Sequence, residues 1–248
     1  MKPRLTPFVL LAALAVLLLG PVAGIALAQE GGGESAASSL ATDNWVTLLF
    51  KHSGPCGWII IILSVIGVAL IVEHAVTLRR DKLAPPHIID EIESLMEEEN
   101  YQETLELCEA EPGFLTNVVA AALPRVNAGF DAMEQSIQEM GEEETIKLNQ
   151  KVGWLNLISS IAPLFGLLGT VLGMVDAFRT IAVKKGAADP ADLAGGIYTA
   201  LITTVEGLFV GIPTLIGYFY FRAKVTTIVL EIGAIIEQLF DRFRPQHN

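Results

Sequence analysis

Three long apolar segments, separated by polar stretches, are the most regular feature of this 248-residue chain. They run from Trp58 to Leu78, from Trp154 to Val175 and from Leu193 to Phe221. A helix needs about 20 apolar residues to cross the hydrocarbon core of a bilayer. The pattern therefore predicts an all-α, polytopic membrane protein with transmembrane helices at 57–78, 153–177 and 193–221.

A fourth apolar run, Phe8–Leu19, is too short to span a bilayer and has the features of a targeting signal. Lys2 and Arg4 precede it, and Ala26-Leu27-Ala28 fits a small-residue cleavage site. We expect residues 1–28 to be a signal peptide and the mature chain to begin at Gln29. The alternative is an uncleaved extra helix.

Basic residues at one end of each long segment predict the orientation of the chain. Arg79 and Arg80 follow the first segment, Lys147 and Lys151 precede the second, and Arg222 follows the third. Because Lys and Arg are enriched on cytoplasmic flanks, we expect an outside N-terminus and a cytoplasmic C-terminus. The remaining predicted parts are an outer linker with an interfacial helix at 29–56, an acidic helical cytoplasmic domain at 79–152, an outer loop at 178–192 and a cytoplasmic C-terminal helix at 222–248.

Charge is strongly segregated from apolar residues along the chain. The sequence is 52% hydrophobic, with a mean hydropathy of +0.50, yet its formal net charge is −12. Between Arg79 and Val152 there are 17 Asp and Glu against 6 Lys and Arg, so most of the negative charge falls in the predicted cytoplasmic domain. An acidic surface without a basic stripe repels nucleic acid, so we expect no nucleic-acid binding.

The acidic stretch lacks the patterns that mark common enzymes and metal sites. It has no HExxH, CxxC, GxSxG or phosphate-loop motif, and runs such as Glu142 to Glu144 are expected to be solvated helix faces. Cys56 and Cys108 fall on opposite sides of the predicted membrane, so no disulfide is expected. We therefore expect no enzymatic activity, no metal and no cofactor.

Small and weakly polar residues form a stripe along one face of each of the two later segments. A helix turns 100° per residue, which places each set within a narrow sector of the helix surface. The second segment carries Ser159, Ala162, Pro163, Gly166, Gly169, Thr170, Gly173 and Ala177, and the third carries Asp192, Gly196, Thr199, Ala200, Thr203, Glu206, Gly207, Val210, Thr214 and Gly217. The two stripes can face each other in a packed interface or line a pore.

The glycines and prolines in these segments are interpreted as packing features. Gly169 and Gly173 form a GxxxG pair, which allows transmembrane helices to approach closely. Proline inside a helix produces a kink and frees a backbone carbonyl, which is tolerated beside protein or water. The residues assigned to helix packing are Pro163, Gly166, Gly169, Gly173, Gly207 and Pro213.

Glu206 is a carboxylate in the middle of the otherwise uncharged third segment. A charge near the bilayer centre costs at least about 2.5 kcal/mol, so it normally faces a cavity, a partner or an ion path. Packing alone does not explain it, and its role is either proton exchange or structural hydrogen bonding. Glu73 and His74, near the cytoplasmic end of the first segment, can reach the interface and are expected to have no such role.

Two motifs resemble the MotA/TolQ/ExbB proton-channel family, most closely its ExbB branch. They are Ile161–Met174 (IAPLFGLLGTVLGM) and Thr203–Pro213 (TTVEGLFVGIP), and Gly54-Pro55 and Ala84-Pro85-Pro86 around the first segment are similar as well. The resemblance implies an inner-membrane oligomer, typically a homo-pentamer, around a dimer of single-span partners of the ExbD or TolR type. It further implies that proton flow energises a TonB-like or TolA-like protein reaching the outer membrane, with the N-terminus of this chain in the periplasm.

The resemblance also assigns residues to the pore, with one departure. The family's pore-lining threonines match Thr170 and Thr204, whereas the helical wheel favours Thr203 over Thr204 as the inward residue. The family's third-span glutamate falls on Thr199, and Glu206 lies seven residues further, on nearly the same face and about 10 Å along the axis. The candidate ion path therefore comprises Thr170, Thr199, Thr203, Thr204 and Glu206.

The function predicted from these features is a proton-channel subunit of an inner-membrane motor that couples the proton motive force to transport or integrity at the outer membrane. Two alternatives stay open. One is a non-conducting membrane scaffold for a single-span partner, and the other is a flagellar-type stator subunit.

Overall fold

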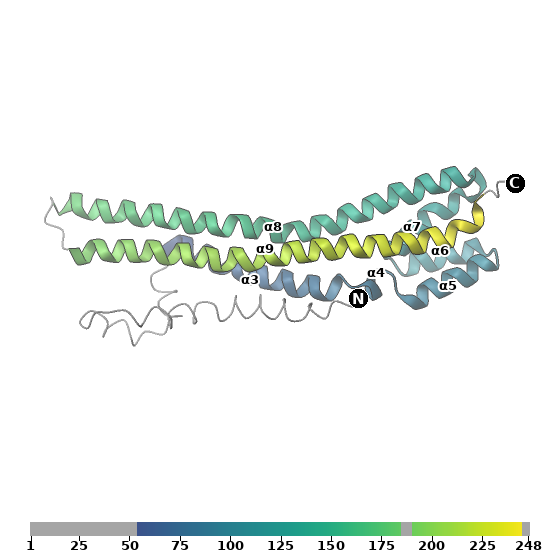
Figure 1. Ribbon diagram of the computed structural model, residues 1–248, viewed down its shortest axis with the longest axis horizontal. Coiled ribbons are helices and arrows are strands. Elements are labelled where there is room, and N and C mark those ends of the chain that lie inside the picture. Colours follow the sequence, from purple (N-terminus) through teal and green to yellow (C-terminus); the bar gives the residue numbers. More distant parts are fainter. Residues whose placement is uncertain (1–53, 185–189, 245–248) are drawn as a thin grey trace. The chain divides into compact units, whose positions relative to one another are not determined.

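The computed structural model describes residues 54–184 and 190–244 of the chain. Within these ranges every regular element is a helix and no strand occurs. The elements, in the labels of Figure 1, are α3 (Gly54–Thr77), α4 (Arg80–Leu83), α5 (Pro86–Glu97), α6 (Tyr101–Ala110), α7 (Phe114–Ala122), the 3-10 helix η1 (Leu123–Ala128), α8 (Phe130–Val183), α9 (Pro190–Phe240) and the 3-10 helix η2 (Asp241–Phe243).

Three of these helices, α3, α8 and α9, are long and apolar enough to cross a membrane. The prediction of an all-α membrane protein with three spanning helices is therefore confirmed. The predicted signal peptide at 1–28, and the interfacial helix predicted within 29–56, lie outside the described residues, which begin at Gly54.

The second and third apolar segments are parts of much longer helices. α8 has 54 residues and continues without a break from the charged stretch into the apolar segment, and α9 has 51 residues. Gly129, whose φ of +102° lies in the region that favours glycine, separates η1 from α8. The change in hydropathy near Gly153 is thus a boundary in composition and not in secondary structure.

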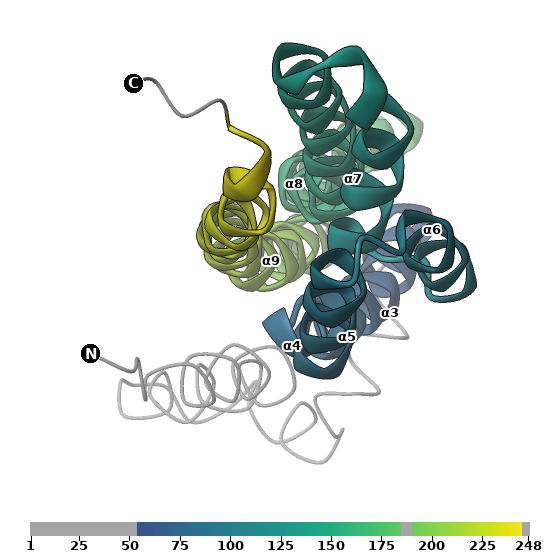
Figure 2. The same cartoon turned by 90° about the vertical axis from the view of Figure 1, so that its right-hand side faces the viewer.

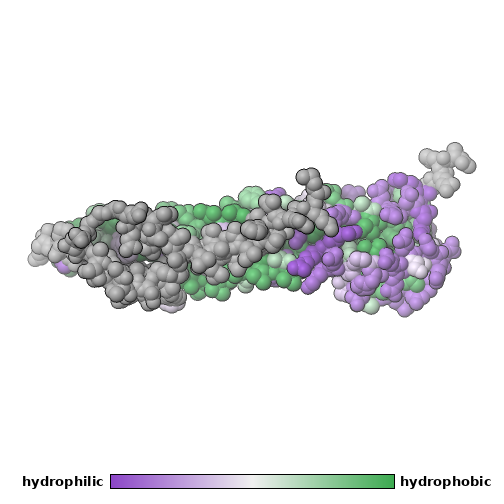
Figure 3. All heavy atoms as spheres, turned by 60° about the horizontal axis from the view of Figure 1, so that its bottom comes forward, coloured by the Kyte–Doolittle hydropathy of each residue, from purple (hydrophilic) through white to green (hydrophobic). Residues whose placement is uncertain are grey.

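The chain packs as two units, and each is described on its own. The apolar unit comprises the described residues 54–72, 154–184 and 190–219, and the acidic unit comprises 73–153 and 220–244. In Figure 3 the visible surface of the apolar unit is mostly hydrophobic, whereas hydrophilic residues cover much of the acidic unit.

The apolar unit is a bundle of α3 with the C-terminal part of α8 and the N-terminal part of α9. Its buried cluster joins Ile60 of α3, Ile158 and Ala162 of α8, and Val210 of α9. α3 also approaches α9 closely, because a Cβ placed on Gly67 would lie 2.9 Å from the Thr214 Cγ2. Large apolar side chains cover the outside of the bundle, including Leu164, Leu167, Val171 and Val175 of α8, as expected for a surface in contact with lipid.

The acidic unit has its own apolar core beneath its charged surface. Ile88, Ile92 and Met96 of α5 recur every four residues and are all buried, which gives α5 one apolar face. The C-terminal part of α9 likewise has an apolar face, on which Ile228 and Ile232 are both at most 4% exposed. Figure 2, which looks along the helices, shows α5 and α6 next to each other and α7 against α8.

His74 is buried in the acidic unit, so the prediction that it reaches the interface is wrong. Its Nε2 lies 3.1 Å from the carbonyl oxygen of Lys151, and its ring meets the Phe221 ring edge-on with centroids 5.6 Å apart. Because a carbonyl only accepts, Nε2 donates in this hydrogen bond. His74 thereby joins α3, α8 and α9, while its neighbour Glu73 is exposed.

Candidate functional site

The site in the apolar unit is built on a close backbone contact between α8 and α9. A Cβ placed on Gly207 would lie 2.6 Å from the carbonyl oxygen of Ala162 and 3.2 Å from the Cα of Pro163. A Cβ placed on Gly166 would lie 2.9 Å from the carbonyl oxygen of Thr203. These distances leave no room for a side chain, so glycine is required on both helices.

The same contact continues toward the C-terminal end of α8 and the N-terminal end of α9. A Cβ placed on Gly173 would lie 2.8 Å from the Cβ of Ala200 and 3.0 Å from the carbonyl oxygen of Gly196, and one placed on Gly169 would lie 2.8 Å from the Cβ of Thr203. The two small-residue stripes therefore face each other within a single chain.

Pro163 lies inside α8 and at the same contact. It has no N–H, so the carbonyl of Ser159, one turn earlier, cannot receive its usual helix hydrogen bond. A Cβ placed on Gly211 would lie 2.7 Å from the Pro163 Cγ and 3.2 Å from the Ser159 oxygen. Glycine at this point lets the α9 backbone reach the freed carbonyl. Pro213 is likewise within a helix, α9, and is buried.

Glu206 is buried within the apolar unit, with 8% of its surface exposed and its Oε2 fully shielded. On its face of α9, Thr203 lies about one turn before it and Val210 one turn after it, and both are buried. Val210 belongs to the apolar cluster with Ile60 and Ile158. The carboxylate therefore occupies a region of low polarity, where a charge is costly.

The two neighbouring threonines both lie on the packed side of α9. Thr203 is 2% exposed and its hydroxyl donates to the Ala200 carbonyl at 2.8 Å, within the same helix. The Thr204 hydroxyl donates across to the Gly166 carbonyl of α8 at 3.1 Å. Each of the two threonines thus faces part of the α8–α9 contact, and which of them lines a pore stays a prediction.

Thr170 and Thr199 are half-buried. The Thr170 hydroxyl donates to the Leu167 carbonyl at 2.6 Å, and the Thr199 hydroxyl donates to the Gly195 carbonyl at 3.0 Å. Each bond lies within one helix and leaves the hydroxyl oxygen able to accept another hydrogen bond. The structure thus gathers Thr203, Thr204 and Glu206 at the contact and leaves Thr170 and Thr199 toward its edge.

Metal chemistry finds no support in the described part of the chain. Among residues 54–184 and 190–244, no three His, Cys, Asp or Glu side chains are grouped so that they could hold a metal ion. The chemistry available at the site is proton transfer through a carboxylate and hydroxyls.

A family profile described as the MotA/TolQ/ExbB proton channel family matches residues 107–234, slightly more than half of the chain. The chain belongs to this family. The match contains α7, α8, the Glu206 site and α9 as far as residue 234. MotA/TolQ/ExbB proteins are channel and scaffold subunits, which agrees with the prediction that the chain is not an enzyme.

Individual relatives carry biopolymer-transport names. An ExbB homologue of Methanothermobacter thermautotrophicus is 29% identical over 188 residues, which is 75% of this chain and 66% of that protein. The biopolymer transport protein exbB1 of Vibrio cholerae is 40% identical over 76 residues, 31% of this chain and 33% of that protein. The chain thus spans between one third and two thirds of the length of these MotA/TolQ/ExbB relatives.

A solved structure, that of C. jejuni MotAB, also aligns with the chain. The alignment covers 94% of this chain and 97% of that one, with a TM-score of 0.46 and 16% sequence identity.

Proposed function

We propose that this chain is the ion-conducting subunit of an energy-transducing motor in the inner membrane, and that Glu206 exchanges protons during transport. The observation that carries the proposal is the burial of this carboxylate in the apolar unit, beside the glycine contact of α8 and α9. Packing against small residues or lipid does not account for an acid at that position, whereas a titratable carboxylate suits a proton path.

The hydroxyl groups around Glu206 are proposed to extend the path. Thr203 and Thr204 lie within a turn of the carboxylate, and Thr199 lies about two turns toward the outer end of α9 on nearly the same face. Thr170 contributes a hydroxyl from α8. Each hydroxyl can accept a hydrogen bond from water while donating to a backbone carbonyl, which is what a relay of ordered water requires.

The partners and topology of the complex are part of the same proposal. The subunit forms a homo-pentamer around a single-span partner of the ExbD or TolR type, and the motor energises a TonB-like or TolA-like protein. The N-terminus is periplasmic and the C-terminus cytoplasmic. The names of the ExbB relatives and the family match support this assignment.

The decisive experiment measures proton flux through the purified complex in liposomes. Glu206→Gln keeps the shape of the side chain and removes its titratable group, so we expect assembly to persist and flux to fall to background. Glu237→Gln, at an exposed position of the same helix, is the matched control and should conduct normally. Full flux in Glu206→Gln would overturn the proton-exchange role of Glu206, whereas absence of flux through the unaltered complex would favour the scaffold function.

A further inference from the structure

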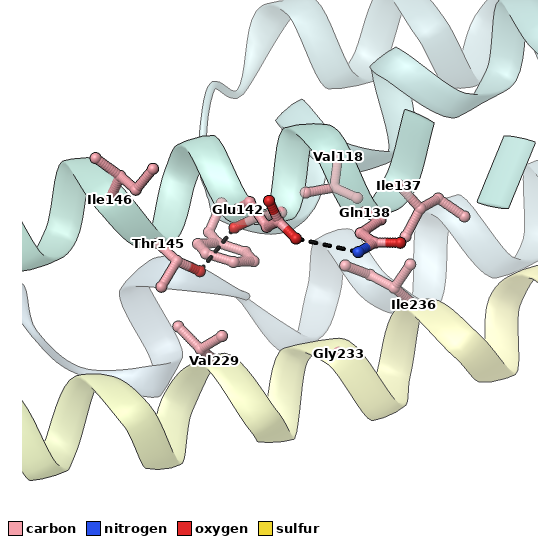
Figure 4. Close-up of a pocket in the computed structure, with 11 residues that line it drawn as sticks. Val118, Ile137, Gln138, Glu142, Thr145, Ile146, Val229, Gly233 and Ile236 are labelled. Carbon is pink, nitrogen blue, oxygen red and sulfur yellow. Dashed lines mark hydrogen bonds between the residues drawn. The ribbon is translucent and has the colours of Figure 1, made fainter. Parts of the chain in front are cut away.

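A groove of about 500 Å³ opens in the acidic unit between α7, α8 and α9 (Figure 4). Apolar side chains from all three helices form it, among them Val118 of α7, Ile137 of α8, and Val229 and Ile236 of α9. Gln138 and Glu142 bring polar groups to the same groove. The groove is therefore mostly apolar, with an acidic group at its side.

The apolar surface extends beyond the groove itself. Ile146, which lines it, is 56% exposed, and Leu230, next to Val229 in the sequence, is 69% exposed. Val229 and Ile236 lie about 12 Å and about 22 Å beyond Phe221 along the axis of α9. The third apolar segment ends at Phe221, so the hydrocarbon of the bilayer does not cover this surface. Apolar patches of this kind on a charged unit mark interaction sites.

The charge around the groove indicates what covers it. Glu142 accepts a hydrogen bond from the Gln138 amide at 3.1 Å, whereas Glu143 and Glu144 share Lys147 at 2.9 Å and 2.8 Å. Of these three carboxylates only Glu142 lines the groove, and it belongs to a unit whose residues 73–153 and 220–244 carry 21 Asp and Glu against 10 Lys and Arg. A carboxylate beside an apolar groove, in a unit of net negative charge, favours a cationic partner.

We propose that this groove binds a cationic amphipathic segment of a partner protein. The apolar side chains of the segment enter the groove, as they do in helix-in-groove complexes, and its Lys or Arg side chains lie over Glu142. The cytoplasmic flank of a single-span membrane protein is rich in Lys and Arg and is the source to which we assign the segment. That assignment of the source rests on the proposed function, whereas the binding chemistry rests on the groove.

Gly233 gives a means of filling the groove without disturbing the chain. It lines the groove, and a Cβ placed on it would meet no atom within 4 Å. Gly233→Leu therefore places a large side chain in the space that the partner would occupy. Gly153→Leu is the matched control, because Gly153 is also helical, has no atom within 4 Å of its added Cβ and lies outside the groove.

The test uses the full-length chain in zwitterionic nanodiscs and a fluorescent helical peptide of about 18 residues, with leucine on one face and lysine on the other. We expect saturable binding that weakens with added salt. Gly233→Leu should weaken it by at least about tenfold, while Gly153→Leu should leave it unchanged. A peptide with glutamate in place of lysine should not bind.

Three outcomes would overturn the proposal: no binding of the lysine peptide, equal binding of the glutamate peptide, or unchanged binding by Gly233→Leu. Loss of subunits from the oligomer of Gly233→Leu in the absence of peptide would also overturn it, since a second copy would then fill the groove. Peptide binding is measured without ion flow, so its failure is distinguishable from a failure of the proton path at Glu206.

Discussion

The hydroxyl of Thr204 donates a 3.1 Å hydrogen bond to the carbonyl oxygen of Gly166 and so ties α9 to α8. The bond lies in the glycine contact, where a Cβ on Gly166 would come within 3.0 Å of the Thr204 Cα. A residue that the family resemblance assigns to the pore therefore also has a structural role. The contribution of Thr204 to stability and its proposed role in the pore can be tested separately.

Thr204→Val should destabilise the protein by about 0.6 kcal/mol and by no more than about 2 kcal/mol, because it keeps the volume of the side chain and deletes one interhelical hydrogen bond. Thermal unfolding of the detergent-solubilised protein measures the change. Thr226→Val is the control, since Thr226 is exposed and its hydroxyl bonds only to Arg222 of its own helix. Equal stability of the two variants would show that the bond to Gly166 contributes nothing.

Gly207→Ala should disrupt the α8–α9 contact, whereas Gly195→Ala in the same helix should not. The added methyl group would meet the Ala162 carbonyl oxygen at 2.6 Å in the first case and no atom within 4 Å in the second. Overpacking of this kind costs about 1 to 3 kcal/mol. The unfolding midpoint and the yield of assembled oligomer should both fall for Gly207→Ala and stay unchanged for Gly195→Ala. Equal losses in the two variants would contradict the close contact at Gly207.

Moving the carboxylate along α9 tests whether the polar path is continuous. In the double variant Thr199→Glu with Glu206→Gln, the acid returns to the position that resembles the family's, on nearly the same helix face. We expect this variant to recover part of the proton flux that Glu206→Gln loses. Thr199→Glu alone, with Glu206 intact, controls for damage by the new charge. Zero flux in the double variant, with normal assembly and a conducting Thr199→Glu control, would mean that Thr199 lies off the path.

Burial raises the pKa of the Cys108 thiol from 9.0 to about 11. The folded state therefore holds this proton more tightly than the unfolded state, so the contribution to stability is complete below pH 9 and is lost as the pH rises toward 11. Over this pH range the free energy of unfolding of Cys108→Ala should therefore fall less than that of the unaltered protein, by at most about 3 kcal/mol. Unfolding free energies of both proteins across the range give the comparison, and identical slopes would exclude a buried thiol.

The topology is testable by labelling with a membrane-impermeant thiol reagent in intact cells. Cys56 and Cys108 are 5% and 2% exposed, so neither native cysteine is a suitable reporter. In a background with both replaced by alanine, Lys184→Cys should be labelled from outside and Glu93→Cys only after lysis, since both positions are exposed. Labelling of Glu93→Cys in intact cells would reverse the proposed orientation.

The sequence predicts the helical, three-span architecture because hydrophobic length is a local property of the chain. It does not predict that α8 runs unbroken from Phe130 to Val183, because a change from charged to apolar residues alters the surroundings of a helix without breaking it. The burial of His74 depends on Lys151 and Phe221, which are distant in the sequence. Pattern alone cannot supply such tertiary contacts.

The candidate site shows the same division between local pattern and tertiary geometry. Helical periodicity places Gly166, Gly173 and Gly207 on the faces that meet, because 100° per residue is fixed by the backbone. It cannot show that Thr204 also reaches α8, since that depends on how far the two backbones approach. The groove at Gly233 was not predicted, because its lining comes from three helices far apart in the chain.

At Gly166 and Gly207 the contact between α8 and α9 is made by backbone atoms. A side chain between two helices can change rotamer and let them slip past each other, but a carbonyl oxygen or a Cα in a helix has no such freedom. We therefore expect α8 and α9 to move together along this stretch. We expect any displacement that accompanies the proposed proton transfer to occur at the exposed surfaces of the pair, where side chains such as Leu167 and Leu208 can rearrange.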